Sequence, residues 1–335
     1  MRKPWFSLLS AVTALGFTAY IALDTFVIAR SYADVETITS SSSRSEAASR
    51  MEDTEADVET ETKTQSPGKS KRTTGESTDE QAREVLAEAV VTDTTYSDGN
   101  ISVVLTTYRE NDTTIYVADV TLSSAEYLKT AFADGTYGKN ITATTSEMAE
   151  DNDAILAVNG DYYGVQEEGY VIRGGVLYRS TVKEDAQDLV IYADGSFEVI
   201  YEEDISAEEL LENGAWDVLS FGPGLVVDGE LNVDTDDEVD RAKTSNPRTA
   251  IGEIDELHYM FVVADGRNDE SEGLSLYQLA QFMQELGCTT AYNLDGGGSS
   301  SMVFNGEVIN DPSGRSSRRN SSGERSVSDI VYIGY

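Results

Sequence analysis

The sequence predicts an α+β fold, a single domain of mostly antiparallel sheets with flanking helices, carried behind an N-terminal membrane anchor. From about residue 95 onward, short alternating or apolar runs follow one another at close spacing. Tight-turn signals such as Asp194-Gly195 and Asp228-Gly229 separate them. Only a few stretches carry the 3.6-residue apolar spacing of a helix. Many hairpins with few helices between them are typical of antiparallel sheets.

Residues 1–30 are predicted to be a transmembrane anchor or a signal segment. Arg2 and Lys3 precede an uncharged run from Trp5 to Leu23, which is long enough for a helix to cross the hydrocarbon layer. Basic residues before the run and an acidic chain after it predict a single-pass protein of the cell membrane with its C-terminal part outside. Secretion after cleavage at Ser31-Tyr32-Ala33 is the alternative, but the run is longer than a usual signal-peptide core.

Residues 31–92 are predicted to be a disordered acidic spacer, and residues 93–335 the folded domain. The spacer is rich in Ser, Thr, Glu and Asp and has almost no aromatic residues. Such a composition cannot bury enough apolar surface to offset the entropy of ordering. Removing residues 1–92 is therefore expected to leave a folded domain. No internal repeat or clean boundary divides the remainder, which favours one domain.

The expected strands are short runs rich in β-branched and aromatic residues, bounded by turn residues. In order they are Ile101–Thr107, Thr114–Leu122, Asp153–Val158, a hairpin over Tyr170–Tyr178, Leu189–Ala193, Ser196–Tyr201, Trp216–Ser220, a hairpin at Asp228-Gly229, Arg248–Gly252, His258–Ala264, Thr289–Leu294, Met302–Phe304 and Val327–Tyr335.

Three helices are expected between these strands. Two serines precede Ala125–Ala131 in the manner of an N-cap. Ser206 with Glu209 three residues on forms the sequence of a capping box. Leu274–Leu286 carries apolar residues at helical spacing along one face, and Gly287 follows as a stop signal.

Charge and rare residues exclude several classes of function. The net charge of −37 makes nucleic acid an unlikely partner, because phosphate contacts need clustered Lys and Arg. Cys288 is the one cysteine and cannot form an internal disulfide, and its apolar surroundings indicate a buried structural role. His258 is the one histidine, so a Cys-His zinc site or a histidine-pair mechanism is excluded.

The stretch Ala291–Phe304 is predicted to hold the chemistry. A strand-like run delivers Asp295, and three glycines and three serines follow at once. Glycines leave backbone N–H groups that a ligand can approach closely, and serine hydroxyls add further hydrogen-bonding groups. A carboxylate beside such a loop suits a site for a sugar, a phosphate or both. A flexible hairpin tip with a solvated aspartate is the alternative interpretation.

Other polar residues fall at the ends of the expected strands, where sites are often assembled. Arg248 and Arg267 could hold a phosphate, because a guanidinium donates two parallel hydrogen bonds. Each alone is also typical of a surface ion pair. Asp161, Asp265 and Asp295 could supply an acid and a base, because carboxylates in different surroundings differ in pKa.

Six motifs in this order are similar to those of the phosphodiester glycosidase family, over roughly Ile101–Tyr335. They are Asn159-Gly160-Asp161-Tyr162-Tyr163, Gly222-Pro223-Gly224-Leu225, Arg248-Thr249-Ala250-Ile251-Gly252, Asp265-Gly266-Arg267, Asn293-Leu294-Asp295-Gly296-Gly297-Gly298-Ser299-Ser300 and Arg325-Ser326-Val327-Ser328-Asp329. The resemblance implies cleavage between a sugar's anomeric carbon and a phosphodiester, with no organic cofactor required. The family's first motif usually reads Asn-Gly-Gly-Phe-Phe, so Asp161 departs from it.

The resulting hypothesis is an extracytoplasmic hydrolase that cleaves sugar-1-phosphodiester linkages in cell-surface glycopolymers or related conjugates. Its catalytic candidates are Asp295, Asp265 and Asp161. Its substrate-binding candidates are Asn159, Arg248, Arg267, Gly296, Gly297, Gly298, Ser299, Ser300 and Arg325.

Two alternatives stay open at this point. The same pocket could bind an anionic glycopolymer without cleaving it. The Asp-rich loops could instead hold Mg²⁺ or Ca²⁺ for a phosphodiesterase that cuts the P–O bond, although no EF-hand spacing is present. The sequence assigns no metal ligands.

Overall fold

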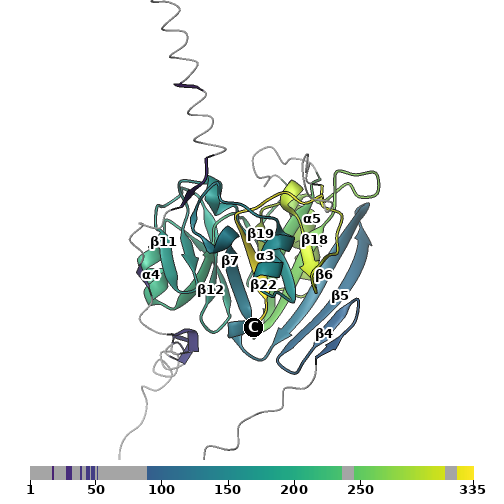
Figure 1. The fold of residues 1–335 in the computed structure, drawn as a ribbon, viewed down its shortest axis with the longest axis horizontal. Coiled ribbons are helices and arrows are strands. Elements are labelled where there is room, and N and C mark those ends of the chain that lie inside the picture. Colours follow the sequence, from purple (N-terminus) through teal and green to yellow (C-terminus); the bar gives the residue numbers. More distant parts are fainter. Residues whose placement is uncertain are drawn as a thin grey trace, which may run out of the picture.

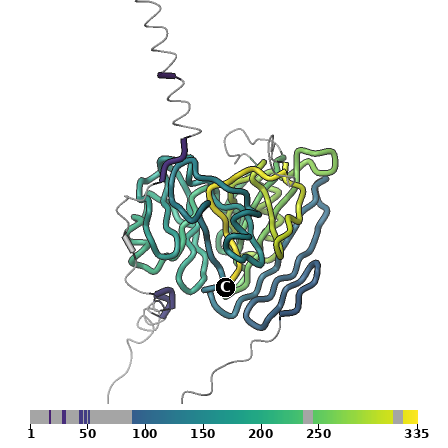
Figure 2. Tube along the Cα trace, viewed as in Figure 1, coloured from purple at the N-terminus to yellow at the C-terminus, as the bar shows by residue number. Residues whose placement is uncertain are grey.

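Strand pairs in the structure run antiparallel, as the sequence predicts (Figure 1). The computed structural model describes residues 17–18, 28–31, 38–39, 43–45, 47–49, 51, 89–235, 245–313 and 323–335. Within these ranges the strands make sheets of nine, six, five and two strands. In the view shared by Figure 1 and Figure 2, the six-stranded sheet lies on the left, the five-stranded sheet in the middle and the nine-stranded sheet on the right.

The nine-stranded sheet contains the strand that leads to Asp295. Its order is β16 (Glu230–Leu231), β15 (Gly224–Val227), β19 (Thr290–Leu294), β17 (Arg248–Asp255), β18 (His258–Ala264), β6 (Thr113–Leu122), β5 (Ile101–Glu110), β4 (Thr95–Ser97) and β3 (Val90–Val91).

Helix α5 (Leu276–Glu285) covers one face of this sheet near β15 and β19. Ser275 and Gln278 form a capping box at the start of the helix. The helix residues Leu279 and Met283 are fully buried. The predicted helix over Leu274–Leu286 is therefore confirmed, and its apolar face packs where the periodicity places it.

The other two large sheets complete the fold. The five-stranded sheet runs β21 (Glu307–Val308), β20 (Met302–Phe304), β9 (Leu156–Asn159), β22 (Asp329–Ile333) and β7 (Leu128–Phe132). The six-stranded sheet runs β13 (Phe197–Tyr201), β12 (Gln187–Tyr192), β14 (Ala215–Leu219), β10 (Val171–Arg173), β11 (Val176–Arg179) and β2 (Ile38–Thr39). The short helices α3 (Thr145–Asp151) and α4 (Ala207–Glu212) flank them, and the two-stranded sheet pairs β1 (Arg30–Ser31) with β8 (Gly138–Lys139).

One hydrophobic cluster draws on all three large sheets. Val331 comes from the five-stranded sheet, Leu189 from the six-stranded sheet and Ile251 from the nine-stranded sheet, and all three are fully buried. Burial of such side chains stabilises each by roughly 1.5–3 kcal/mol relative to exposure. The ends of strands from different sheets are therefore held firmly against one another.

Two local predictions differ from the structure. The helix expected over Ala125–Ala131 is wrong: a 3₁₀ turn at Ala125–Tyr127 passes into strand β7, which pairs with β22. Pairing with a neighbouring strand overrides the local capping signal. Helix α3 was not expected, although Thr144 and Glu147 form a capping box at its start.

The predicted anchor over residues 1–30 lies almost wholly outside the described residues. In the part of the chain that is described, no helix has both the length and the apolar character needed to span a membrane. The spacer over residues 31–92 also stays a prediction, but some of its described residues contact the domain. Strand β2 pairs with β11, and the Arg44 guanidinium donates to the carbonyls of Leu128 and Ala193 at 2.7 and 3.0 Å.

Candidate active site

The glycine-serine loop carries the chain from one sheet to another. Asp295 follows β19 in the nine-stranded sheet, and Met302 begins β20 in the five-stranded sheet. A Cβ on Gly296 would lie 2.9 Å from the Pro247 carbonyl, and Gly297 has a φ of +63°. Only glycine meets both demands without strain. The path of the chain between the two sheets therefore requires glycine at both positions.

The Asp295 carboxylate lies at the start of this loop and is largely buried. Its Oδ2 atom accepts hydrogen bonds from Ser299 Oγ at 2.6 Å and from Arg325 Nη2 at 2.5 Å. The residue is 8% exposed. Burial raises the pKa of this carboxyl group, and the Arg325 charge and the Ser299 hydroxyl oppose that shift. The result is a partly desolvated carboxylate held in one orientation.

Asn159 at the end of β9 ties this loop to the five-stranded sheet. Its Nδ2 group donates to the Asp295 carbonyl at 2.6 Å, and its Oδ1 atom accepts from Thr249 Oγ1 at 2.8 Å. The neighbouring Gly160 carbonyl accepts from the Asp295 amide at 3.2 Å. Because Asn159 is fully buried, these bonds hold the backbone of Asp295 in place.

Arg325 reaches the site from the far side of the loop. Its guanidinium lies 5.7 Å from the centre of the Tyr162 ring, at cation–π distance. The preceding residue, Glu324, is buried and accepts hydrogen bonds from Ser301 Oγ at 2.8 Å and from the Ser146 amide at 3.1 Å. Glu324 thus anchors the backbone that presents Arg325.

The two other candidate arginines differ in exposure. Arg267 is exposed, and its guanidinium donates to Asn246 Oδ1 at 2.7 Å. A Cβ on Gly297 would lie 3.1 Å from that guanidinium, so the arginine lies against the glycine loop. Arg248 is 5% exposed, and its Nε atom donates to the Leu274 carbonyl at 2.9 Å. Arg267 therefore faces solvent beside the loop, whereas Arg248 lies beneath it.

Asp265 directly follows β18, which is separated from β19 by β17 in the sheet. Strand spacing puts the two strand ends about 10 Å apart. Its Oδ1 atom accepts from Asn310 Nδ2 at 3.1 Å and from the Asp311 amide at 3.0 Å. The same Asn310 amide donates to the Ser300 carbonyl at 3.1 Å, so Asp265 is linked to the serine loop. Burial raises the pKa of Asp265 to about 6.

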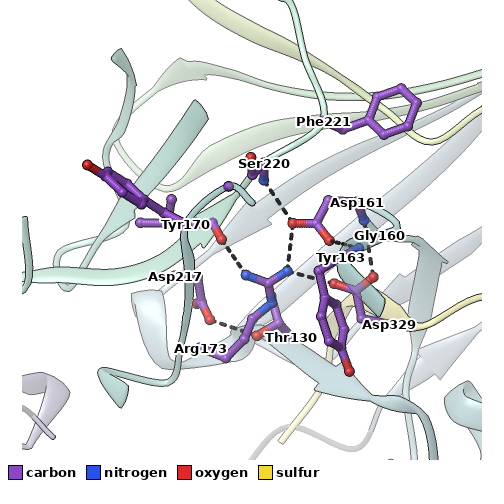
Figure 3. A network of polar contacts seen from close by, with 12 residues as sticks. Thr130, Gly160, Asp161, Tyr163, Tyr170, Arg173, Asp217, Ser220, Phe221 and Asp329 are labelled. Carbon is purple, nitrogen blue, oxygen red and sulfur yellow. Dashed lines mark hydrogen bonds and ion pairs between the residues drawn. The ribbon is translucent and has the colours of Figure 1, made fainter. Parts of the chain in front are cut away.

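Asp161 lies in a separate, completely buried cluster (Figure 3). Its Oδ2 atom accepts from Arg173 Nη2 at 2.9 Å and from the Ser220 amide at 2.8 Å. Its Oδ1 atom accepts from the Tyr163 amide at 3.0 Å. Its two oxygens are thus occupied by internal donors.

A model of the phosphodiester glycosidase family matches residues 152–334, which is more than half of the chain. The chain belongs to the phosphodiester glycosidase family. Every candidate site residue from Asn159 to Arg325 lies inside the matched range. The resemblance stated from the motifs is confirmed.

Individual members of curated protein sets match this chain over a similar length. The SPbeta prophage-derived uncharacterized protein YomE of Bacillus subtilis is 28% identical over 204 residues, covering 59% of this chain and 31% of that protein. The Mus musculus N-acetylglucosamine-1-phosphodiester alpha-N-acetylglucosaminidase is 27% identical over 208 residues, covering 57% of this chain and 40% of that protein. The chain thus spans less than half the length of either relative.

A solved structure shares the fold. The zebrafish N-acetylglucosamine-1-phosphodiester alpha-N-acetylglucosaminidase catalytic domain superposes with a TM-score of 0.57 at 21% identity. The match covers 70% of this chain and 83% of that one. The mostly antiparallel architecture predicted from the sequence is thus that of the family.

The structure brings together most of the residues predicted for the site. Asn159, Asp295, Ser299 and Arg325 are joined by hydrogen bonds, and Arg267 lies against Gly297. Gly296, Gly298 and Ser300 complete the same loop, and Asp265 reaches it through Asn310. Asp161 and Arg248 lie beneath the loop surface. Among the residues that the structure describes, no group of three or more His, Cys, Asp or Glu side chains is placed to hold a metal ion.

Two residues of the site were not found from the sequence. Tyr162 stands in a motif that was noted, but its φ of +68°, which aims the ring at Arg325, cannot be read from its letter. Arg173 lies inside a hairpin strand, twelve residues from Asp161, and no local pattern marks it. Both make contacts with residues that lie far away along the chain, Tyr162 with Arg325 and Arg173 with Asp329.

Proposed function

We propose that this chain is an extracytoplasmic hydrolase that cleaves sugar-1-phosphodiester linkages in cell-surface glycopolymers or related conjugates. The observation that carries the proposal is the partly desolvated Asp295 carboxylate, which lies beside the glycine-serine loop and two arginines that are open to solvent. The family supports the chemistry, and the mammalian relatives named as N-acetylglucosamine-1-phosphodiester glycosidases support the substrate class. Arg2 and Lys3, followed by the uncharged run from Trp5 to Leu23, support an extracytoplasmic location of the domain.

Arg325 and Arg267 hold the phosphate in this proposal. Both guanidiniums lie against the glycine-serine loop, and both retain solvent exposure. Planar guanidiniums suit a phosphodiester because they donate two parallel hydrogen bonds to its oxygens. The Gly298 amide adds a backbone donor in this proposal, because the Gly297 amide donates to the Pro247 carbonyl at 2.8 Å and the Gly296 amide donates to the Asp295 carboxylate. A phosphate held in this way leaves as a stable anion and needs little protonation.

The carboxylates act at the sugar. Asp295 is the carboxylate paired with Arg325, so it stabilises positive charge at the anomeric carbon or activates the attacking nucleophile there. Asp265, with a pKa of about 6, supplies a second proton-transfer group linked to the same loop. Ser299 orients the Asp295 carboxylate through its 2.6 Å hydrogen bond.

The test is hydrolysis of synthetic sugar-1-phosphodiesters in ¹⁸O-labelled water by the full-length protein. Cleavage of the C–O bond releases free sugar that carries the label. A label found in the phosphate instead would indicate the metal-assisted P–O route. A protein that binds these compounds but turns over none of several sugars would contradict the proposal and favour a binding role.

A further inference from the structure

A single guanidinium is shared by two buried carboxylates beneath the candidate site. Arg173 Nη2 lies 2.9 Å from Asp161 Oδ2 and 2.8 Å from Asp329 Oδ2 (Figure 3). Its Nη1 atom donates to the carbonyls of Ile172 and Val218. Arg173 is 5% exposed, and both carboxylates are completely buried. Arg173 belongs to the six-stranded sheet and Asp329 to the five-stranded sheet, so the cluster joins two sheets.

The two carboxylates hold the loop that follows β9. The Asp161 amide donates to Asp329 Oδ1 at 3.1 Å, and the Gly160 amide donates to the Asp329 carbonyl at 2.9 Å. A Cβ on Gly160 would lie 2.3 Å from Asp329 Oδ1, so the loop packs directly on this carboxylate. Tyr162 within the loop has a φ of +68°, an unfavourable conformation for a bulky residue. The surrounding contacts must therefore hold it there.

This loop touches Asp295 from two sides. The Gly160 carbonyl accepts from the Asp295 amide at 3.2 Å. The Tyr162 ring lies beneath the Arg325 guanidinium, and that guanidinium pairs with the Asp295 carboxylate. A shift of the loop would therefore move both the backbone of Asp295 and its charged partner.

We propose that Arg173 is a positioning residue for Asp295, acting through Asp161 and Asp329 on the Gly160–Tyr163 loop. The inference rests on the proposed function, because it assigns Asp295 the chemical step. The hydrogen-bond partners of Arg173 include Asp161, Asp329 and the Ile172 carbonyl, all of which belong to buried residues. Its effect on the reaction is indirect, through the geometry of the loop.

The main test compares Arg173→Lys and Arg173→Met with Arg44→Met. Lysine keeps the charge but cannot serve both carboxylates and two carbonyls at once. We expect Arg173→Lys to lower kcat by about 10- to 100-fold while KM stays within about threefold, since small misplacements of catalytic groups have such effects. Arg173→Met leaves two buried carboxylates without a counter-charge, so it should lose more activity and much stability.

Arg44→Met is the matched control. It also removes a buried guanidinium that donates to backbone carbonyls, those of Leu128 and Ala193. These carbonyls are not part of the Gly160–Tyr163 loop. The control should lower the melting temperature and leave kcat unchanged. If Arg173→Lys loses stability to the same extent yet keeps the wild-type kcat, Arg173 is structural and the proposal fails.

Hydrogen exchange gives a readout that does not depend on turnover. Arg173→Lys should reduce amide protection in the peptides covering residues 156–166 and 291–303, whereas Arg44→Met should reduce it in neither. Loss of protection confined to residues 156–166 would overturn the coupling to Asp295. A wild-type protein that is inert on all substrates would contradict the proposed function, and the exchange data would still decide whether Arg173 positions the Asp295 loop.

Discussion

The Asp295 carboxylate and the Arg325 guanidinium are paired at 2.5 Å, and the two side chains differ in exposure. The Asp295 side chain is 11% exposed and that of Arg325 is 44% exposed. An anion that enters from solvent therefore meets the guanidinium before the carboxylate. Arg325 compensates the buried negative charge of Asp295. In the proposed function it also binds the phosphate, so phosphate binding and the pKa of Asp295 depend on the same guanidinium.

The first prediction concerns Asp295→Asn. The substitution keeps the size of the side chain and the acceptor for Ser299, but it removes the charge and the capacity for proton transfer. Turnover of a sugar-1-phosphodiester should fall by about 10²–10⁴-fold, with little change in the melting temperature. Steady-state kinetics and thermal unfolding measure the two effects.

Asp134→Asn is the matched control, because Asp134 is exposed and its φ of +55° is one that asparagine tolerates. It should keep the wild-type rate. If Asp295→Asn is folded and equally active, the catalytic role moves to Asp265, because both oxygens of the buried Asp161 are occupied by internal donors.

The second prediction concerns Arg325→Met. Removing the guanidinium should raise KM for a phosphodiester by about tenfold or more, since a hydrogen bond to a charged group contributes roughly 1.5–3 kcal/mol. The pKa of Asp295 should rise further, because Arg325 opposes the effect of burial. The acidic limb of the pH–rate profile should therefore move to higher pH.

The kinetic pH profile of Arg325→Met is compared with that of Arg109→Met. Arg109 is an exposed arginine whose guanidinium contacts Thr114 and the Glu270 carbonyl rather than the glycine-serine loop. An unchanged KM and an unchanged profile in Arg325→Met would exclude Arg325 from phosphate binding.

The third prediction concerns pH-dependent stability at Asp265. Burial raises the pKa of this carboxyl group to about 6, above its value in the unfolded chain. The folded form therefore holds its proton more tightly, and the free energy of unfolding should fall as pH rises from about 4 to about 6. Asp265→Asn can still accept from Asn310 and Asp311, so it should flatten this dependence.

Urea unfolding at pH 4.5 and pH 7.5 measures that change. The free energy of unfolding of Asp265→Asn minus that of wild type should be about 1–2 kcal/mol larger at pH 7.5 than at pH 4.5. Asp134→Asn serves again as the exposed control. Equal slopes for Asp265→Asn and wild type would show that Asp265 titrates normally.

Structural features could be predicted from the sequence where the residues that form them are adjacent in the chain. Asp295, Gly296–Gly298 and Ser299 form one continuous segment, so their proximity in space could be predicted from the letters alone. The hairpins around Gly174-Gly175 and Asp194-Gly195 were found because turn residues mark them locally.

The sequence did not predict the placement of residues whose contacts come from another sheet. The placement of Asp161 depends on Arg173 and Asp329, which lie twelve and 168 residues away along the chain. Whether its carboxylate faces a ligand or a buried guanidinium is decided by tertiary packing, which no local pattern encodes. Likewise Arg248 and Arg267 both border the ends of their strands, yet only Arg267 is exposed.

The last prediction concerns the N-terminal segment. Composition predicts that residues 31–92 do not join the core, yet the Arg44 guanidinium is buried and donates to the carbonyls of Leu128, Ala193 and Tyr192. It also lies 5.6 Å from the centre of the Trp216 ring. Each such hydrogen bond contributes about 0.5–1.5 kcal/mol net, so Arg44→Ala should cost about 2–3 kcal/mol in total.

For a domain of this size that loss lowers the melting temperature by roughly 4–10 °C. Deleting residues 1–88 should leave a folded protein with at least this fall, whereas Ser45→Ala, at an exposed neighbouring position, should leave the melting temperature unchanged. Thermal unfolding of the three proteins beside wild type decides the point. A truncated protein with the melting temperature of the wild type would show that the Arg44 contacts add no stability. Residues 31–92 would then behave as the spacer that their composition predicts.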